Sequence, residues 1–330
     1  MANSSLYPRG IHRLALFLAG YVVLLITAGG LVKSLEAGLS VPDWPLSYGM
    51  LNPPRWWQIE TVRAEHGHRL IAGVALIMTV ILTVWIARKE ERAWVRKLAY
   101  LALGAVLAQA ALGGITVLFY LPTAISVSHA GLAQAFLALI VTLAVVTSRF
   151  WFSRRQPAAG VDVAGLVALT SATTVLIYLQ ILVGAVMRHI GAGLAIPDFP
   201  LVFGGLIPPK LDFAIGIHYT HRIGALVVAT LIFWTLGRVL RLAAKEPALS
   251  RPAVALAAMV LVQGTLGGLV VWTSKAVLPN SLHVGGGALL IAISVVLTLA
   301  THRLSWLADQ QTAKAETPVV DMLGAEQATT

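Results

Sequence analysis

Eight long apolar runs, separated by short polar segments, dominate the pattern of the chain. A helix that crosses a membrane needs about 20 mostly apolar residues, and each run reaches that length. We therefore predict an all-α membrane protein with eight transmembrane helices. Their expected ranges are 12–32, 66–87, 95–119, 127–148, 163–187, 218–240, 253–273 and 282–302.

The second half of the chain repeats motifs of the first half in the same order, at offsets of 153 to 155 residues. The recurring segments are 38–46 and 193–201, 109–114 and 263–268, and 129–131 and 283–285. Such a repeat indicates a duplication. Because four helices return the chain to the side where it started, we predict two tandem, parallel four-helix bundles, unlike the inverted repeats of many transporters.

This duplication also predicts the domain plan. The chain should have a cytoplasmic N-terminus, an N-terminal four-helix half, a cytoplasmic linker, a C-terminal four-helix half and a disordered cytoplasmic tail. The tail is expected because the sequence from Ala308 onward is polar and aperiodic. The expected boundaries are 1–11, 12–150, 151–162, 163–303 and 304–330.

Two loops, which contain 38–46 and 193–201, carry prolines that forbid a continuous helix. Each loop precedes a repeated histidine-containing motif. Trp44, Trp56 and Trp57 suit the level of the lipid headgroups. The loops are interpreted either as interfacial segments that cap the bundle or as lids over a site that faces outward.

Composition and charge support a polytopic membrane protein: 58% of the residues are hydrophobic and 12% are charged. The net charge is +10, and sixteen of the 24 Lys and Arg residues fall in segments that would share one side of the membrane. This is the positive-inside pattern. It predicts a multi-pass protein of the inner or plasma membrane with both termini cytoplasmic, and it does not favour binding to nucleic acid. The absence of cysteine excludes disulfides, Fe–S clusters and thiolate zinc sites.

Four histidines, one about a turn into each even-numbered span, are the strongest candidates for chemistry: His68, His129, His221 and His283. These spans all run in the same direction, so the four imidazoles should lie at similar depth near the outer boundary. Two imidazoles from facing helices can bind the iron of a flat macrocycle from both sides. Zinc or copper is less favoured, because a bare ion needs further ligands.

The two halves differ at one position. Glu65 lies one helical turn before His68, whereas His218 stands at the matching place before His221. Oxidation of a substrate needs a proton acceptor or a group that stabilises positive charge, whereas a fixed electron-transfer centre does not. The first half is therefore the candidate for chemistry and the second for a fixed cofactor. Alternatively, Glu65 hydrogen-bonds a ligating histidine or pairs with Arg69.

Several neighbouring polar residues have two interpretations. Arg69 and Arg222 are candidate partners for haem propionates, or they extend toward lipid headgroups. His66 points away from Glu65 on a helix and is expected at the interface. Three intramembrane glutamines either orient ligating histidines or hydrogen-bond between helices: Gln109, Gln180 and Gln263.

Residues 12–303 resemble the haem A synthase family in three features. These are the motif Glu65-x-x-His68-Arg69, one histidine near the start of each even-numbered span, and the repeat of the halves. That resemblance implies oxidation of the C8 methyl group of haem O to a formyl group, which gives haem A for cytochrome oxidases. It implies Glu65 as the catalytic carboxylate. It assigns His68 and His129 to the iron of the substrate haem O, in an N-terminal catalytic half.

The resemblance further implies that the C-terminal half binds a haem b cofactor (iron protoporphyrin IX). Its iron ligands would be His221 and His283. Many family members have a cysteine pair in the outer loops, and this chain has none, so no mechanism through that disulfide is available here. Expected partners are haem O, membrane lipid, the farnesyltransferase that makes haem O, and an electron carrier.

Two other functions remain open on the sequence. A membrane cytochrome b would bind haems through the same histidines and only transfer electrons. Such proteins usually place haems toward opposite membrane faces, whereas these histidines are expected on one side. A haem transporter would tolerate the loss of Glu65 and would move unmodified substrate.

Overall fold

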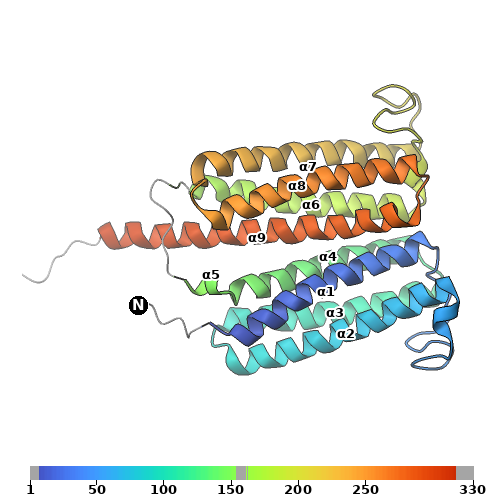
Figure 1. Cartoon of the computed structure of the whole chain (residues 1–330), viewed down its shortest axis with the longest axis horizontal. Helices are drawn as coiled ribbons and strands as arrows, with labels where there is room; N and C mark the ends of the chain where they lie inside the picture. Colours follow the sequence, from blue (N-terminus) through green and yellow to red (C-terminus); the bar gives the residue numbers. More distant parts are fainter. Residues whose placement is uncertain (1–6, 154–160, 162, 317–330) are drawn as a thin grey trace, which may run out of the picture.

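The computed structural model describes residues 7–153, 161 and 163–316, and within them the chain is almost entirely helical (Figure 1). Eight of its helices are long and apolar enough to cross a membrane, which confirms the predicted class. These helices are α1 (Arg9–Ser34), α2 (Glu60–Lys89), α3 (Ala93–Leu118), α4 (Thr123–Val146), α6 (Ala164–His189), α7 (Phe213–Ala243), α8 (Pro247–Trp272) and α9 (Val277–Glu316). The shorter elements are α5 (Arg149–Phe152) and the 3₁₀ turns η1 (Trp56–Gln58) and η2 (Ala192–Leu194).

Local sequence signals set several helix starts. Pro8 and Pro122 immediately precede α1 and α4, and Pro247 is the first residue of α8. Proline suits these positions because the first amides of a helix have no intrahelical partner. Asp212 caps α7, since its carboxylate accepts a hydrogen bond of 2.8 Å from the Ile215 amide.

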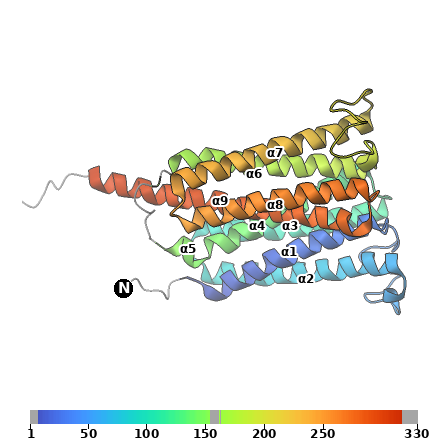
Figure 2. The same ribbon diagram turned by 45° about the horizontal axis from the view of Figure 1, so that its top comes forward.

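The long helices pack as two groups of four. In the first group α1 contacts α2, α2 contacts α3, α3 contacts α4, and α4 contacts α1; helices α6, α7, α8 and α9 close a ring in the same way. The groups meet where α9 packs against α1 and α4, and where α4 packs against α6 (Figures 1 and 2). Because each has two neighbours in the opposite group, α4 and α9 are the most buried of the eight helices.

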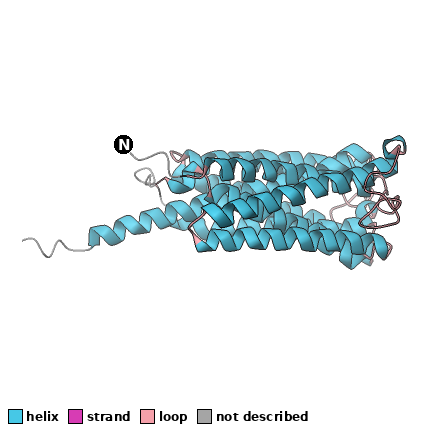
Figure 3. Cartoon of the chain, turned by 90° about the horizontal axis from the view of Figure 1, so that it is seen from below, coloured by secondary structure: helices cyan, strands magenta, loops and turns pink. Residues whose placement is uncertain are grey.

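The two ends of the molecule differ. Loops 35–59 and 190–212 gather at one end, here called the loop end, at the right of Figures 1 and 3. The start of α1, the short helix α5 and the last turns of α9 lie at the opposite end, here called the terminal end. Helices α2, α4, α7 and α9 all begin at the loop end, so they bring their histidines to the same end of the molecule.

Seven of the eight long helices start two to six residues earlier than the sequence predicts, and the end of α9 differs most. Helix α2 starts at Glu60, and therefore His68 lies about two turns into its helix rather than one. The predicted disordered tail 304–330 is wrong for its first part, because α9 continues as a helix to Glu316. Leu304 and Leu307 are buried, and the following residues are mostly strong helix formers that extend the helix. Residues 317–330 lie outside the described residues, as does most of the expected linker 151–162.

Candidate functional site

Each of the four histidines packs against a glycine of the preceding long helix. A Cβ atom at Gly29, Gly113 or Gly267 would lie 3.2 Å from the Cε1 atom of His68, His129 or His283, respectively. A Cβ at Gly184 would lie 2.8 Å from Cε1 of His221. Any larger residue would therefore press on the imidazole. The same contact occurs four times, so the duplication preserves the glycine that contacts each ring as well as the histidine itself.

In the second half the two imidazoles have the separation expected of two ligands to one metal ion. The ring centroids of His221 and His283 are 6.4 Å apart, with an angle of 75° between the planes. A metal–imidazole bond of about 2 Å places two such centroids roughly 6 Å apart. The Nδ1 atom of His283 is buried and has no hydrogen-bond partner among the described residues, and the same is true of His68 and His129. Among the described residues, no group of three or more His, Cys, Asp or Glu side chains could hold a bare metal ion, so the paired rings suit the iron of a macrocycle.

One ring is held more firmly than the others. The side-chain amide of Gln180 on α6 donates a hydrogen bond of 2.7 Å to the carbonyl oxygen of His221. The same amide nitrogen lies 2.9 Å from the Nδ1 atom of the His221 ring. Gln109 and Gln263 bond only to the backbone carbonyls of His129 and His283, at 2.9 and 2.7 Å. Gln180 therefore orients a candidate ligand, whereas the other two glutamines hydrogen-bond between helices.

Position 25 of the first half corresponds to Gln180 and is a leucine. No side-chain amide can reach the ring of His68 from that position, and Nδ1 of His68 has no partner in the described part of the chain. The two halves thus differ in how tightly they hold the first histidine of each pair.

Glu65 is buried and bonds the loop above it. Its Oε2 accepts a hydrogen bond of 2.8 Å from the amide of Val41, and its Oε1 forms an ion pair of 2.6 Å with Arg69. Arg69 also donates to the carbonyl oxygens of Val41, Asp43 and Leu46 at 3.0, 2.6 and 2.7 Å. The carboxylate and the guanidinium together hold residues 41–47 against α2.

The second half uses the same arrangement with an imidazole in place of the carboxylate. The amide of Ile196 lies 3.3 Å from Nδ1 of His218, and Nε of Arg222 lies 3.1 Å from Nε2. Arg222 also donates to the carbonyl oxygens of Ile196 and Leu201 at 3.1 and 2.8 Å. A carboxylate accepts both kinds of bond at once, whereas a neutral imidazole has only one acceptor nitrogen. The acid therefore makes the first loop attachment the stronger of the two.

Both loops close with the same turn. Tyr48 and Gly49 have positive φ angles of 52° and 74°, and Phe203 and Gly204 repeat them at 53° and 79°. The Asp43 carboxylate accepts from the amides of Gly49 and Tyr48, both at 2.7 Å. These hydrogen bonds, first that of Gly49, lower the pKa of Asp43 below its ordinary value.

The second turn is built the same way, since the amides of Gly204 and Phe203 donate to Asp198 at 2.7 and 2.8 Å. The hydrogen bond from Gly204 is the main cause of a lowered pKa for Asp198.

An aromatic residue of each loop rests on a glycine of the bundle. A Cβ at Gly114 would lie 2.6 Å from the Trp44 ring, and one at Gly268 would lie 2.9 Å from the Phe199 ring. The Trp272 indole donates 2.9 Å to the Phe199 carbonyl and fixes the second loop further. Both loops are seated on the helices that carry the histidine-facing glycines, as a cap over the site requires.

Sequence reasoning misjudged His66. It was expected at the interface, but it is buried. Its Nδ1 lies 2.8 Å from the Ser47 hydroxyl, and its ring packs edge-on against Trp56 at 4.9 Å. The 61–66 stretch alone carries no signal for this, because the loop that covers His66 lies about twenty residues earlier in the chain.

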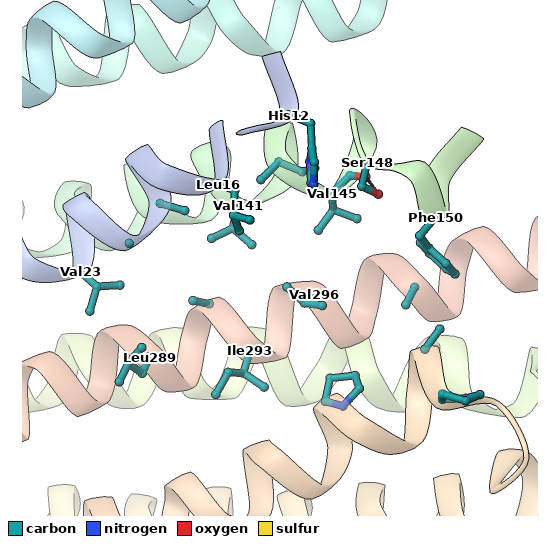
Figure 4. Close-up of a pocket in the computed structure, with 18 residues that line it drawn as sticks. His12, Leu16, Val23, Val141, Val145, Ser148, Phe150, Leu289, Ile293 and Val296 are labelled. Atoms are coloured by element: carbon teal, nitrogen blue, oxygen red, sulfur yellow. Dashed lines mark hydrogen bonds between the residues drawn. The ribbon is translucent and has the colours of Figure 1, made fainter. Parts of the chain in front are cut away.

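A separate groove lies nearer the terminal end, between the two groups of helices (Figure 4). It has a volume of about 590 Å³, and its walls are almost wholly apolar. Two of its lining residues, Val23 and Leu289, lie six positions from Gly29 and His283, which is about 9 Å along a helix. Its one histidine, His12, bonds the Ala144 carbonyl at 2.9 Å. The groove therefore offers an apolar surface and is distinct from the histidine site.

The sequence also matches known proteins over most of its length. The family model described as cytochrome oxidase assembly protein matches residues 62–295. The chain belongs to the cytochrome oxidase assembly protein family. The matched segment runs from the start of α2 into α9, so it includes Glu65 and all four histidines.

Curated relatives in this cytochrome oxidase assembly family carry the name heme A synthase. The protein of Symbiobacterium thermophilum is 32% identical over 234 residues, covering 68% of this chain and 75% of the relative. That of Halalkalibacterium halodurans is 33% identical over 221 residues, covering 65% and 72%. That of Mesorhizobium japonicum is 34% identical over 298 residues, covering 75% and 79%. The family resemblance deduced from the motifs is confirmed.

Proposed function

We propose that this protein is a haem A synthase, a membrane oxidoreductase that converts the C8 methyl group of haem O into the formyl group of haem A. The relatives named heme A synthase support this activity. The observation that carries it is the asymmetry of the duplicated halves. Both halves present a pair of imidazoles seated on glycines, but only the first has a buried carboxylate, Glu65, one turn from a ligand position.

The second half is the better holder of a resident haem b. His221 and His283 have the spacing of two ligands to one iron, and Gln180 orients the first ring. The chemistry that haem b supplies when bound there is one-electron redox exchange. The residues around it have only to hold the macrocycle in place, which agrees with the lack of an acid at position 218.

The first half is the better site for the substrate. His68 and His129 would bind the iron of haem O, and the ring of His68 lacks a side-chain partner that would fix it. Glu65 is held at this site by Val41 and Arg69. Each carboxylate oxygen has a second lone pair, so Glu65 can accept a proton released during methyl oxidation while it keeps both bonds.

The same proposal orients the protein in the membrane. The basic segments follow the positive-inside rule if the terminal end is cytoplasmic and the loop end, with both histidine pairs, lies outside. Haem O would arrive from the farnesyltransferase that makes it, and the electrons would leave through a separate carrier. Both partners are inferred from the activity.

Glu65→Gln tests the role of the carboxylate. The variant should retain the haem b spectrum, because Glu65 lies outside the second half. It should yield no haem A when co-expressed with a source of haem O, and haem O or a partly oxidised product should accumulate. The readout is extraction of the haems, followed by mass analysis for farnesylated, formyl-bearing porphyrin. Glu60→Gln, on the same helix and exposed, is the matched control and should produce haem A normally.

Normal haem A output from Glu65→Gln would remove this residue from the reaction. If wild type binds haem but never yields a formyl-bearing porphyrin, the electron-transfer cytochrome becomes the better interpretation. Movement of unmodified haem that survives the loss of Glu65 would instead favour a transporter.

A further inference from the structure

Two haems bring carboxylate groups to the site, and the arginines that the sequence suggested as their partners are already engaged. Arg69 makes four hydrogen bonds of 2.6–3.0 Å to Glu65 and to the carbonyls of the first loop. Arg222 bonds two carbonyls of the second loop and His218. Releasing either guanidinium would detach a loop, so a cation that holds no loop is the better partner for a propionate.

Two other basic residues occupy equivalent positions in the halves. Lys33 comes four residues after Gly29, which faces His68, and Arg188 comes four residues after Gly184, which faces His221. Residues four apart share one face of a helix. Each basic side chain therefore lies on the histidine-facing side of its helix, one turn closer to the loop end than the imidazole.

Arg188 lies where the two groups of helices meet. It donates to the carbonyl of Gly30 at 2.7 Å and to the hydroxyl of Ser34 at 2.9 Å, and it lies 3.3 Å from two oxygens of Asn280. All of these acceptors are uncharged, and Arg188 has no carboxylate partner among the described residues. A guanidinium at least partly removed from water is stabilised further when it gains an anion.

Lys33 is half-buried, and its side-chain ammonium has no hydrogen bond or ion pair with any described residue. Lys33 and Arg188 are both within electrostatic range of His189, and so is His129. Arg188 is in turn within range of His283. Lys33 and Arg188 are thus carried on the two helices that face His68 and His221, near the loop end.

We propose that Arg188 binds a propionate carboxylate of the haem held by His221 and His283, and that Lys33 does the same for the haem held by His68 and His129. The identity of these ligands as haems rests on the proposed function. The guanidinium suits a fixed cofactor because it makes directional, paired hydrogen bonds. The flexible ammonium of Lys33 suits a ligand that arrives and departs.

The test compares free and esterified porphyrin. Full-length protein, purified in detergent from haem-depleted cells, is titrated with iron protoporphyrin IX and with its dimethyl ester. Wild type should prefer the free acid by at least about tenfold, the size expected for a charge-assisted hydrogen bond. Arg188→Gln should lose most of this preference while binding the ester as wild type does. The midpoint potential of the bound haem should also fall, because removal of a nearby positive charge favours the oxidised state.

Two variants serve as controls. Arg241 lies on α7 near the terminal end, and the Arg241→Gln variant should keep the full preference for the free acid over the ester. Arg222→Gln should also keep it if the guanidinium serves only the loop. Lys33 is tested in a His283→Ala background, where only the first pair remains complete, and Lys33→Gln should then remove the preference there.

Three results would overturn the proposal. Arg188→Gln could keep the full preference, it could weaken the acid and the ester equally as a purely structural bridge would, or the preference could disappear in Arg222→Gln instead. In each case wild type still binds haem, so the proposed function stands. Failure of wild type to bind either porphyrin would overturn both.

Discussion

At the scale of single residues, the repeated glycine–histidine contact is the most informative feature. Four glycines on α1, α3, α6 and α8 each leave room for one imidazole of the next long helix. A glycine in a helix interior costs about 1 kcal/mol relative to alanine. Four such costs at equivalent places indicate that packing requires glycine there. In each case the group that fills the space is a histidine ring.

A graded series of alanine substitutions tests this interpretation. Gly184→Ala should reduce the haem content of the purified protein most strongly, because its Cβ would lie 2.8 Å from the His221 ring. Gly267→Ala should have a smaller effect, since the corresponding distance to His283 is 3.2 Å. Haem per protein, read from the absorbance spectrum, is the measurement.

The control for this series is Gly264→Ala, on the same helix as Gly267 with nothing within 4 Å of the added atom. It should leave haem content unchanged and slightly stabilise α8. An equal loss of haem in all three variants would mean that the loss does not come from contact between the added Cβ and the imidazole.

At the scale of elements, each loop is a small preformed unit attached to its bundle at a few points. An aspartate closes the turn, an arginine binds loop carbonyls, and an aromatic ring rests on a glycine. The repeat of this design in loops 35–59 and 190–212 agrees with a cap over each histidine pair. The first cap differs by an ionic attachment at its base, through Glu65 and Arg69.

Acid should loosen the turn of the first loop. The pKa of Asp43 is lower in the folded loop than in an unfolded chain, because the amides of Gly49 and Tyr48 bind the carboxylate. Its contribution to stability is therefore complete above the unfolded pKa of about 4 and is lost as the pH falls through the still lower folded value. Hydrogen exchange of the Tyr48 and Gly49 amides, corrected for intrinsic rates, measures this change.

Asp43→Asn should remove the pH dependence of these two amides, and the equivalent turn at Asp198 should keep its own. Protection at Tyr48 and Gly49 that stays constant through the acid range in wild type would show that the carboxylate does not hold the turn.

At the scale of the whole molecule, the two groups of helices join through small residues. A Cβ at Gly285 of α9 would overlap the hydroxyl of Thr27 on α1, and a Cβ at Gly131 of α4 would lie 2.8 Å from Leu182 on α6. Close approach of backbones at small residues is how membrane helices gain packing energy. The junction also holds Arg188 of α6, which donates to the Gly30 carbonyl and the Ser34 hydroxyl of α1 at 2.7 and 2.9 Å.

Gly285→Val should therefore weaken the whole assembly. Overpacking at a tight contact costs about 1–3 kcal/mol, and the melting temperature in detergent should fall accordingly. Gly104→Val on α3, where an added Cβ meets nothing within 4 Å, is the matched control and should have little effect. An unchanged melting temperature for Gly285→Val would mean that α1 and α9 separate at that point at no cost.

Much of this organisation is readable from the sequence because its causes are local. Apolar runs long enough to cross a membrane determine the eight helices, and the offset motifs reveal the duplication. The chain direction that follows brings four histidines to one end. Only the helix ends moved: α9, for example, runs past the expected stop at 302 to Glu316, since helix propensity there outweighs polarity.

The partners of each polar side chain were decided by tertiary structure. Glu65, Arg69 and His66 could each have faced lipid, a ligand or another helix, and their choice depends on a loop that folds back from about twenty residues earlier. The roles of Gly184 and Arg188 become visible only when α6 packs against α7 and the Arg188 side chain reaches Gly30 and Ser34 of α1. Hydrophobic periodicity specifies where a helix lies, but a hydrogen bond or a tight contact needs two atoms brought together from distant parts of the chain.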